Sequence, residues 1–124
     1  MRDGFVKVAA VTPKIRVADT KYNAGVIVEG IREAAAAGAK VIVLPELVIT
    51  GYTCSDLFTQ DILLKESKEA LFKIAEYTKE KDAIIFIGVP LAIDGELYNV
   101  AAALNHGEIL GLTTKTFLPN YGEF

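Results

Sequence analysis

The feature that most constrains the fold is a run of four aliphatic residues, 41–44, which ends at Pro45 and Glu46. A continuous run of this kind predicts a strand buried on both faces, because a half-buried strand alternates apolar with polar residues. Pro45 cannot donate a ladder hydrogen bond, so the strand is expected to end there. Glu46 is then delivered at the carboxyl end of a buried strand, where open α/β sheets place their ligand sites.

The surrounding sequence predicts an α/β domain with a mixed sheet and two long helices. Strands are expected over residues 5–11, 40–44, 83–93, 97–104 and 109–114, long helices over 20–37 and 61–81, and a short helical turn at 55–58. Asp19 is a suitable N-cap for the first long helix, and Gly38 a suitable C-cap. Tight hairpin turns are expected at residues 94–95 and 105–108. The first strand, helix and strand form a βαβ unit with a right-handed crossover.

Composition narrows the class of protein. The chain has 124 residues, 52% of them hydrophobic, which is enough for one domain with a real core and argues against disorder. Its net charge is −3 and it has no basic cluster, so nucleic acid is not an expected partner. No apolar run approaches the roughly 18 residues of a membrane span, and no signal peptide is recognisable, so a cytoplasmic location is expected.

Two residues could carry chemistry, and each allows two interpretations. Glu46 is either a structural carboxylate, solvated just past the strand or capping the short helix that follows, or a general base whose pKa is raised by apolar surroundings. Lys115 is either a charge at the end of a strand or, near a carboxylate, a group that stabilises a developing oxyanion.

Other reactive side chains are expected to be structural. The chain has one cysteine, Cys54, and one histidine, His106, so neither an internal disulfide nor a metal site is predicted. Cys54 is expected to be a buried thiol, and His106 a solvated turn residue. Tyr52 could lie at the mouth of a site or pack in an ordinary way.

Two motifs together resemble the nitrilase (carbon–nitrogen hydrolase) superfamily. They are Leu-Pro-Glu-Leu-x-Ile-Thr-Gly-Tyr at residues 44–52 and Thr-Lys-Thr-Phe-Leu-Pro-Asn-Tyr-Gly-Glu-Phe at 114–124. The resemblance covers the whole chain and implies part of a four-layer αββα sandwich, in which two mixed sheets pack together. It makes Glu46 the general base, Lys115 the residue that stabilises the tetrahedral intermediate, and Tyr52 and Phe124 residues of the substrate pocket. It places the nucleophilic cysteine after Phe124.

Within the superfamily, residues 50–58 and 118–124 are most similar to the glutaminase domains of glutamine-dependent NAD synthetases. In that family a thiol attacks the side-chain amide of glutamine, and the ammonia passes to a C-terminal synthetase domain. That domain uses ATP and magnesium to convert nicotinic acid adenine dinucleotide to NAD. Residues 1–124 are accordingly expected to be the N-terminal portion of a glutaminase domain, without a cofactor of their own and inactive alone.

Two other interpretations stay open. The chain could belong to a stand-alone nitrilase-type amidase, or it could be a non-catalytic module that binds a partner. In every case one face of the sheet is expected to lack the second sheet that should cover it. An uncovered apolar face predicts self-association, so a homo-oligomer is expected.

Overall fold

The computed structural model describes residues 4–51 and 61–115. In chain order the elements are β1 (Val8–Ala10), α1 (Thr20–Ala36), β2 (Val41–Val43), α2 (Asp61–Tyr77), a 3₁₀ turn η2 (Thr78–Glu80), β3 (Ile84–Ile93), β4 (Glu96–Asn105) and β5 (Glu108–Thr114). The predicted five strands and two long helices are confirmed in type and order. The short helical turn expected at 55–58 lies outside the described residues, as do Tyr52, Cys54 and Phe124.

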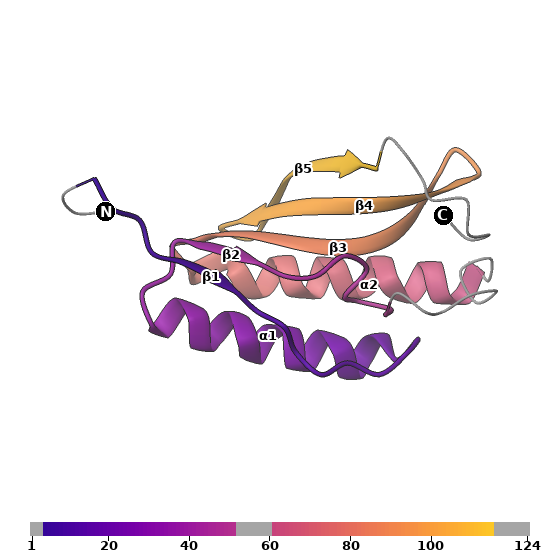
Figure 1. The fold of residues 1–124 in the computed structure, drawn as a ribbon. Helices are drawn as coiled ribbons and strands as arrows, with labels where there is room; N and C mark the ends of the chain where they lie inside the picture. The colour runs from indigo at the N-terminus through magenta and orange to yellow at the C-terminus, as the bar shows by residue number, and fades with distance from the viewer. Residues whose placement is uncertain (1–3, 52–60, 116–124) are drawn as a thin grey trace.

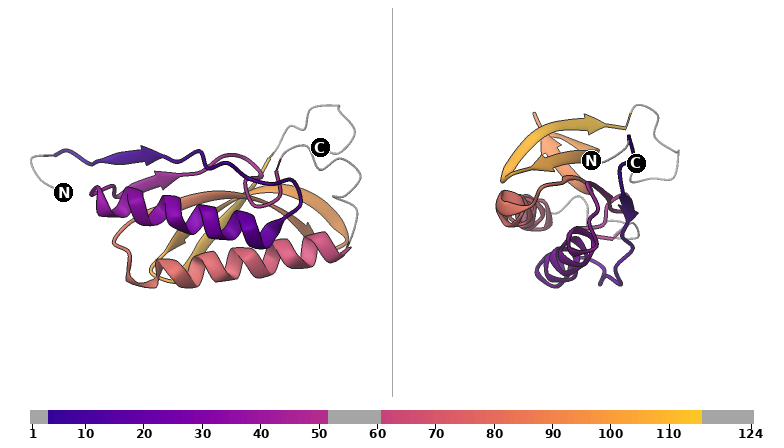
Figure 2. Two further views of the ribbon diagram at one scale, coloured as in Figure 1. Left: turned by 90° about the horizontal axis from the view of Figure 1, so that it is seen from below. Right: turned by 90° about the vertical axis from the view of Figure 1, so that its left-hand side faces the viewer.

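The strands form one mixed sheet in the order β1-β2-β3-β4-β5. β1, β2 and β3 run parallel to one another, whereas β3, β4 and β5 are antiparallel neighbours. Both helices lie side by side on one face of this sheet (Figures 1 and 2). The described residues therefore form one helix layer and one sheet layer, which are two of the four layers that the αββα resemblance implies.

The first long helix, α1, begins and ends where local chemistry predicts. The carboxylate Oδ1 of Asp19 accepts a hydrogen bond from the Tyr22 amide at 3.1 Å, which satisfies one of the free N–H groups at the start of α1. Gly38 follows the end of α1 with a φ of 92°, a conformation that glycine adopts without strain. α2 ends at Tyr77 and continues as η2, so it is shorter than predicted.

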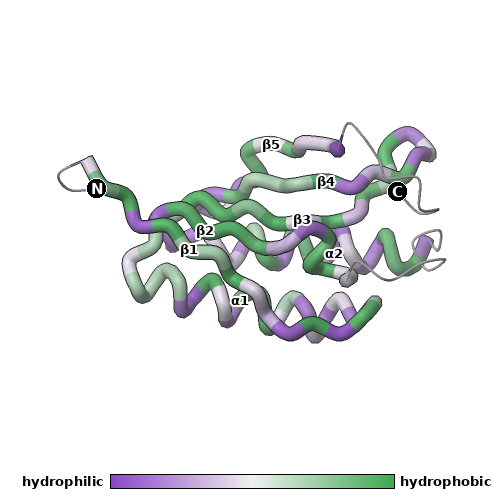
Figure 3. The backbone as a smooth tube through the Cα atoms, in the orientation of Figure 1, coloured by the Kyte–Doolittle hydropathy of each residue, from purple (hydrophilic) through white to green (hydrophobic). Residues whose placement is uncertain are grey.

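The core lies between the helices and the sheet. Ile27 and Ile31 of α1 and Ile74 of α2 are fully buried against it. The strands contribute further fully buried side chains, namely Ile42, Ile85, Val89, Ala102 and Leu104. Figure 3 shows hydrophobic residues along the central strands. The removal of these aliphatic side chains from water is the main term that stabilises the packing of the helices on the sheet.

The opposite face of the sheet is apolar and exposed, and we call it the open face. Its exposed large side chains are Val8, Val43, Ile84 and Phe86. Val43 is 45% exposed although Ile42 is fully buried, so the prediction that residues 41–44 are buried on both faces is wrong for this chain. The helices cover only one face, and among the described residues no helix or strand covers the other at these positions. The uncovered sheet face expected from the sequence is present.

The two hairpins have the predicted turn chemistry. Asp94 and Gly95 have φ values of 51° and 81°, and His106 and Gly107 have 48° and 86°, as type I′ turns require. His106 is exposed in its turn, as expected. The register between β4 and β5 then shifts: Leu104 pairs with Ile109, but Ala103 pairs with Gly111. β5 therefore carries one extra residue, Leu110, in a β-bulge.

Candidate active site

The chain leaves β2 and crosses over β3 on the open face. The Leu44 amide donates to the carbonyl of Phe86 at 2.9 Å, and the Ile49 amide donates to the carbonyl of Gly88 at 3.4 Å. Between these contacts Leu47 is fully buried with a φ of 52°, and the Gly51 amide donates to its carbonyl at 2.7 Å. Residues 44–51 thus form a compact turn that holds Glu46 above the sheet.

A buried asparagine on α1 fixes this turn from the other side. Asn23 is fully buried, and its Nδ2 donates to the carbonyls of Arg16 at 2.7 Å and Ile49 at 2.9 Å. Its Oδ1 accepts from the Arg16 amide at 2.7 Å. One side chain therefore satisfies three backbone groups in two loops, one between β1 and α1 and the other after β2. Buried polar groups require partners of this kind. Its position inside an otherwise apolar helix stripe was the sequence signal.

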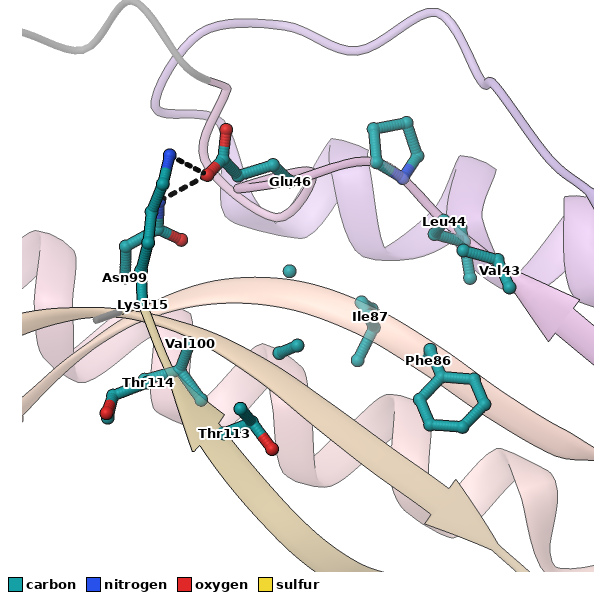
Figure 4. A pocket seen from close by; sticks show the side chains of 13 residues that line it. Val43, Leu44, Glu46, Phe86, Ile87, Asn99, Val100, Thr113, Thr114 and Lys115 are labelled. Atoms are coloured by element: carbon teal, nitrogen blue, oxygen red, sulfur yellow. Dashed lines mark hydrogen bonds and ion pairs between the residues drawn. The ribbon is translucent and has the colours of Figure 1, made fainter. Parts of the chain in front are cut away.

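Glu46 and Lys115 meet although they lie 69 positions apart in the sequence. Nζ of Lys115 donates to Oε1 of Glu46 at 2.8 Å, and Nδ2 of Asn99 donates to the same oxygen at 2.7 Å (Figure 4). The three side chains come from the turn after β2, from β4 and from the residue that follows β5. The side chains of Lys115 and Glu46 are 34% and 42% exposed, so this is a partly solvated ion pair at the surface of the open face.

The electrostatics of Glu46 differ from the sequence prediction. The hydrogen bond from Lys115 lowers the pKa of the Glu46 carboxyl, and Asn99 and the charge of Lys115 lower it further. Partial burial acts in the opposite direction and is outweighed. The predicted rise in the pKa is therefore wrong, because two donors stabilise the carboxylate form. Glu46 is ionised at neutral pH and can accept a proton.

The carboxylate lies beside a pocket of about 360 Å³ on the open face. Its lining is largely apolar and comes from β2, β3, β4 and β5, and includes Val43, Phe86, Gly88, Val100, Ala101 and Thr113. A concave apolar surface with a few convergent polar groups is the usual form of a small-molecule site. The charged groups that line this pocket are Glu46 and Lys115.

Asn99 is a site residue that sequence reasoning missed. It lies in the middle of the predicted strand 97–104 and is only 5% exposed. Asparagine is depleted in strands and costly to bury without a partner, so its presence there was the available signal.

Among residues 4–51 and 61–115 no cluster of three or more His, Cys, Asp or Glu side chains could hold a metal ion. In the same part of the chain, neither helix has the length and apolar character needed to cross a bilayer.

Comparison with known proteins gives a consistent picture. The carbon–nitrogen hydrolase family matches residues 7–123. The chain is 34% identical over 121 residues to the glutamine-dependent NAD(+) synthetase of Mycobacterium leprae, an alignment that covers 98% of this chain and 18% of that protein. The chain thus spans about a fifth of the length of this relative.

Solved structures show the same relationship. The glutamine-dependent NAD(+) synthetase from Cytophaga hutchinsonii superimposes with a TM-score of 0.87 at 32% identity, covering 93% of this chain and 20% of that one. An amidase from Nesterenkonia sp. shares the fold with a TM-score of 0.77 at 22% identity, covering 97% of this chain and 46% of that one. From the matched family and the shared fold, the chain belongs to the carbon–nitrogen hydrolase family.

Proposed function

We propose that this chain is part of the glutamine-hydrolysing domain of a glutamine-dependent NAD synthetase. The observation that carries the proposal is the ion pair between Glu46 and Lys115 at 2.8 Å, beside the pocket on the open face. The relatives named glutamine-dependent NAD(+) synthetase support the substrate, and the family match supports cleavage of a carbon–nitrogen bond.

Glu46 acts as the general base in this proposal. Its Oε1 is occupied by both donors, whereas among the described residues no side chain or backbone group donates to Oε2. Figure 4 shows this second oxygen pointing away from the two hydrogen bonds. Oε2 is thus the atom that takes the proton from an attacking thiol, while Oε1 keeps the carboxylate in place.

Lys115 stabilises negative charge on the reacting carbonyl oxygen. When the thiolate adds to the side-chain amide carbon of glutamine, the carbonyl oxygen becomes an oxyanion, and a nearby ammonium group lowers the energy of that state. The proton held by Glu46 passes to the amide nitrogen, the carbon–nitrogen bond breaks and ammonia leaves. Water then cleaves the thioester to release glutamate. Tyr52 and Phe124 are proposed to line the glutamine pocket.

The ammonia is proposed to serve an attached synthetase domain, which is the partner of this domain in the intact protein. ATP and magnesium belong to that second reaction. The described residues do not fit a metal site, because they contain no group of acidic, histidine or cysteine ligands that could bind one. No step of the glutaminase reaction above passes through either cofactor.

The test uses the intact protein and two nitrogen sources. Glu46→Gln and Lys115→Met should each abolish NAD formation from glutamine, while free ammonia, which bypasses the glutaminase, should still support it. Lys40→Met is the matched control, because Lys40 forms a surface ion pair with Asp82 at 2.8 Å at the far end of the sheet. Full glutamine-dependent activity in either site variant would show that its assigned role is wrong. Glutamine hydrolysis without NAD formation would favour a stand-alone amidase.

A further inference from the structure

We propose that Asn99 is a positioning residue that fixes the geometry of the Glu46–Lys115 pair, an inference that rests on the proposed base role of Glu46. Asn99 contacts both members. Its side-chain Nδ2 donates to Oε1 of Glu46 at 2.7 Å, and its backbone carbonyl accepts from the Lys115 amide at 3.0 Å. One residue of β4 thereby holds the side chain of Glu46 and the backbone of Lys115, two residues from distant parts of the sequence.

The burial of Asn99 indicates that its amide serves the site and not the fold. Asn99 is 5% exposed, and its neighbour Val100 is 1% exposed on the helix-facing side. Asn99 points to the open face, where the turn at Glu46 covers it. Burial of an apolar side chain here would cost less free energy, because a buried amide needs a hydrogen-bond partner to replace its lost hydration. Among the described residues, the only hydrogen-bond partner of this amide is Glu46.

The orientation of the amide follows from the charge that it faces. A carboxylate accepts hydrogen bonds and cannot donate them, so the amide must present its NH₂ group to Glu46. A neutral donor also has a specific advantage over a second cation. It holds the carboxylate without adding another positive charge that would weaken it further as a base.

The consequence is a fixed carboxylate plane. Held by Lys115 alone, the carboxylate could rotate and exchange its two oxygens at the flexible ammonium group. Two donors that arrive at Oε1 from β4 and from the residue after β5 remove that freedom and leave Oε2 directed away from them (Figure 4). Since a base must lie within hydrogen-bond reach of the proton it abstracts, a displacement of about 1 Å can cost about 100-fold in rate.

The closing experiment separates this role from a purely structural one. In the intact protein, Asn99→Ala should lower kcat for glutamine by about 100-fold with a much smaller change in KM. Ammonia-driven activity should be unchanged. The pKa of Glu46, followed by carboxyl ¹³C NMR, should rise toward its ordinary value because one donor is lost; Lys115 is the charged group that acts on this carboxyl, and it remains. Asn105→Ala is the matched control: Asn105 lies on the same strand but donates to the Ala83 carbonyl at 2.8 Å, away from the site.

Asn99→Asp is the second variant, because it keeps the shape of the side chain but replaces the donor with a negative charge. It should lower kcat at least as much and raise the pKa of Glu46 further. The proposal is overturned if both Asn99 variants keep the wild-type kcat and the wild-type titration of Glu46. It is also overturned if neither variant folds while Asn105→Ala does, because the amide would then serve the fold. Failure of the proposed function looks different: Glu46→Gln would retain full activity, while the titration of Glu46 would still respond to Asn99.

Discussion

A β-carbon added to Gly88 would lie 2.8 Å from the backbone carbonyl carbon of Glu46, so β3 passes directly beneath the residue that carries the carboxylate. The same atom would lie 2.6 Å from the carbonyl oxygen of Pro45 and would also collide with the amide of Leu47. These neighbours are backbone atoms, which cannot turn aside as a side chain can. Glycine at this position is what allows the turn to rest on the sheet.

Gly88→Ala should therefore move Glu46 away from its two donors. We expect a loss of about 1–3 kcal/mol in the free energy of unfolding, typical of overpacking, together with reduced glutamine-dependent activity of the intact protein. Gly111→Ala on β5 is the control, because a β-carbon there would meet nothing within 4 Å. It should change stability by less than about 1 kcal/mol. Equal effects of the two variants in denaturant titrations would contradict this account.

Lys115→Met should make stability less dependent on pH. The pKa of Glu46 is lowered in the folded protein, so the ion pair stabilises the fold above the ordinary glutamate value of 4.5. That stabilisation is lost as the pH falls through the lowered folded pKa. The free energies of unfolding of the two proteins should therefore differ most near neutrality, by about 1 kcal/mol or less for a partly exposed pair. In acid the two values should converge. Denaturant titrations from about pH 3 to pH 7 measure it, and a constant difference would refute it.

Asn23→Ala should be among the most costly substitutions outside the hydrophobic core. It would leave two backbone groups of Arg16 and the carbonyl of Ile49 without their partner, in a fully buried position. We expect a loss of about 3 kcal/mol or more. Asp82→Asn removes only an exposed ion pair with Lys40 and should cost less than about 1 kcal/mol. Chemical denaturation of both variants provides the comparison, and similar midpoints would be inconsistent with the anchoring role of Asn23.

The open face predicts that the 124-residue chain associates with itself. Phe86 is 38% exposed there and Val43 45%, next to further apolar side chains. Phe86→Lys should reduce association in sedimentation experiments, because a charge would have to be buried in the contact. Phe72→Lys is the control, since Phe72 is 53% exposed on α2, on the other side of the sheet. A wild-type chain that stays monomeric at high concentration would exclude this behaviour.

Sequence patterns predicted most of the fold because the helices and hairpins are specified locally. Asp19 starts α1, and the left-handed turn residues join β3, β4 and β5, as their residue types require. The first strand was predicted over residues 5–11 but spans only Val8–Ala10. In the described part of the chain it is an edge strand, and its partner there, β2, is itself three residues long. Apolar runs indicate a strand, but the partner determines its length.

The site was predictable only in part, because contacts between distant strands leave no local pattern. Glu46 and Lys115 were singled out by their positions at strand ends, a family resemblance gave them roles, and the structure brings them together. The direction of the Glu46 pKa could not be read from its own sequence neighbours, which are apolar, since the deciding donors come from β4 and from the end of β5. Asn99 was not predicted as a site residue, because a strand is recognised in a sequence by its apolar residues.

The bulge in β5 decides which side of the sheet Lys115 belongs to. Side chains alternate along a strand, so a shift by one residue exchanges the two faces. With Leu110 as the extra residue, Ala101 pairs with Thr113 and the Lys115 amide reaches Asn99. If the same residues paired without the bulge, the register seen between Leu104 and Ile109 would continue. Asn99 would then lie opposite Thr114, and Lys115 would point toward the helices. A slip of one residue in the pairing of β4 and β5 would therefore separate the ion pair while leaving every site residue in the sequence.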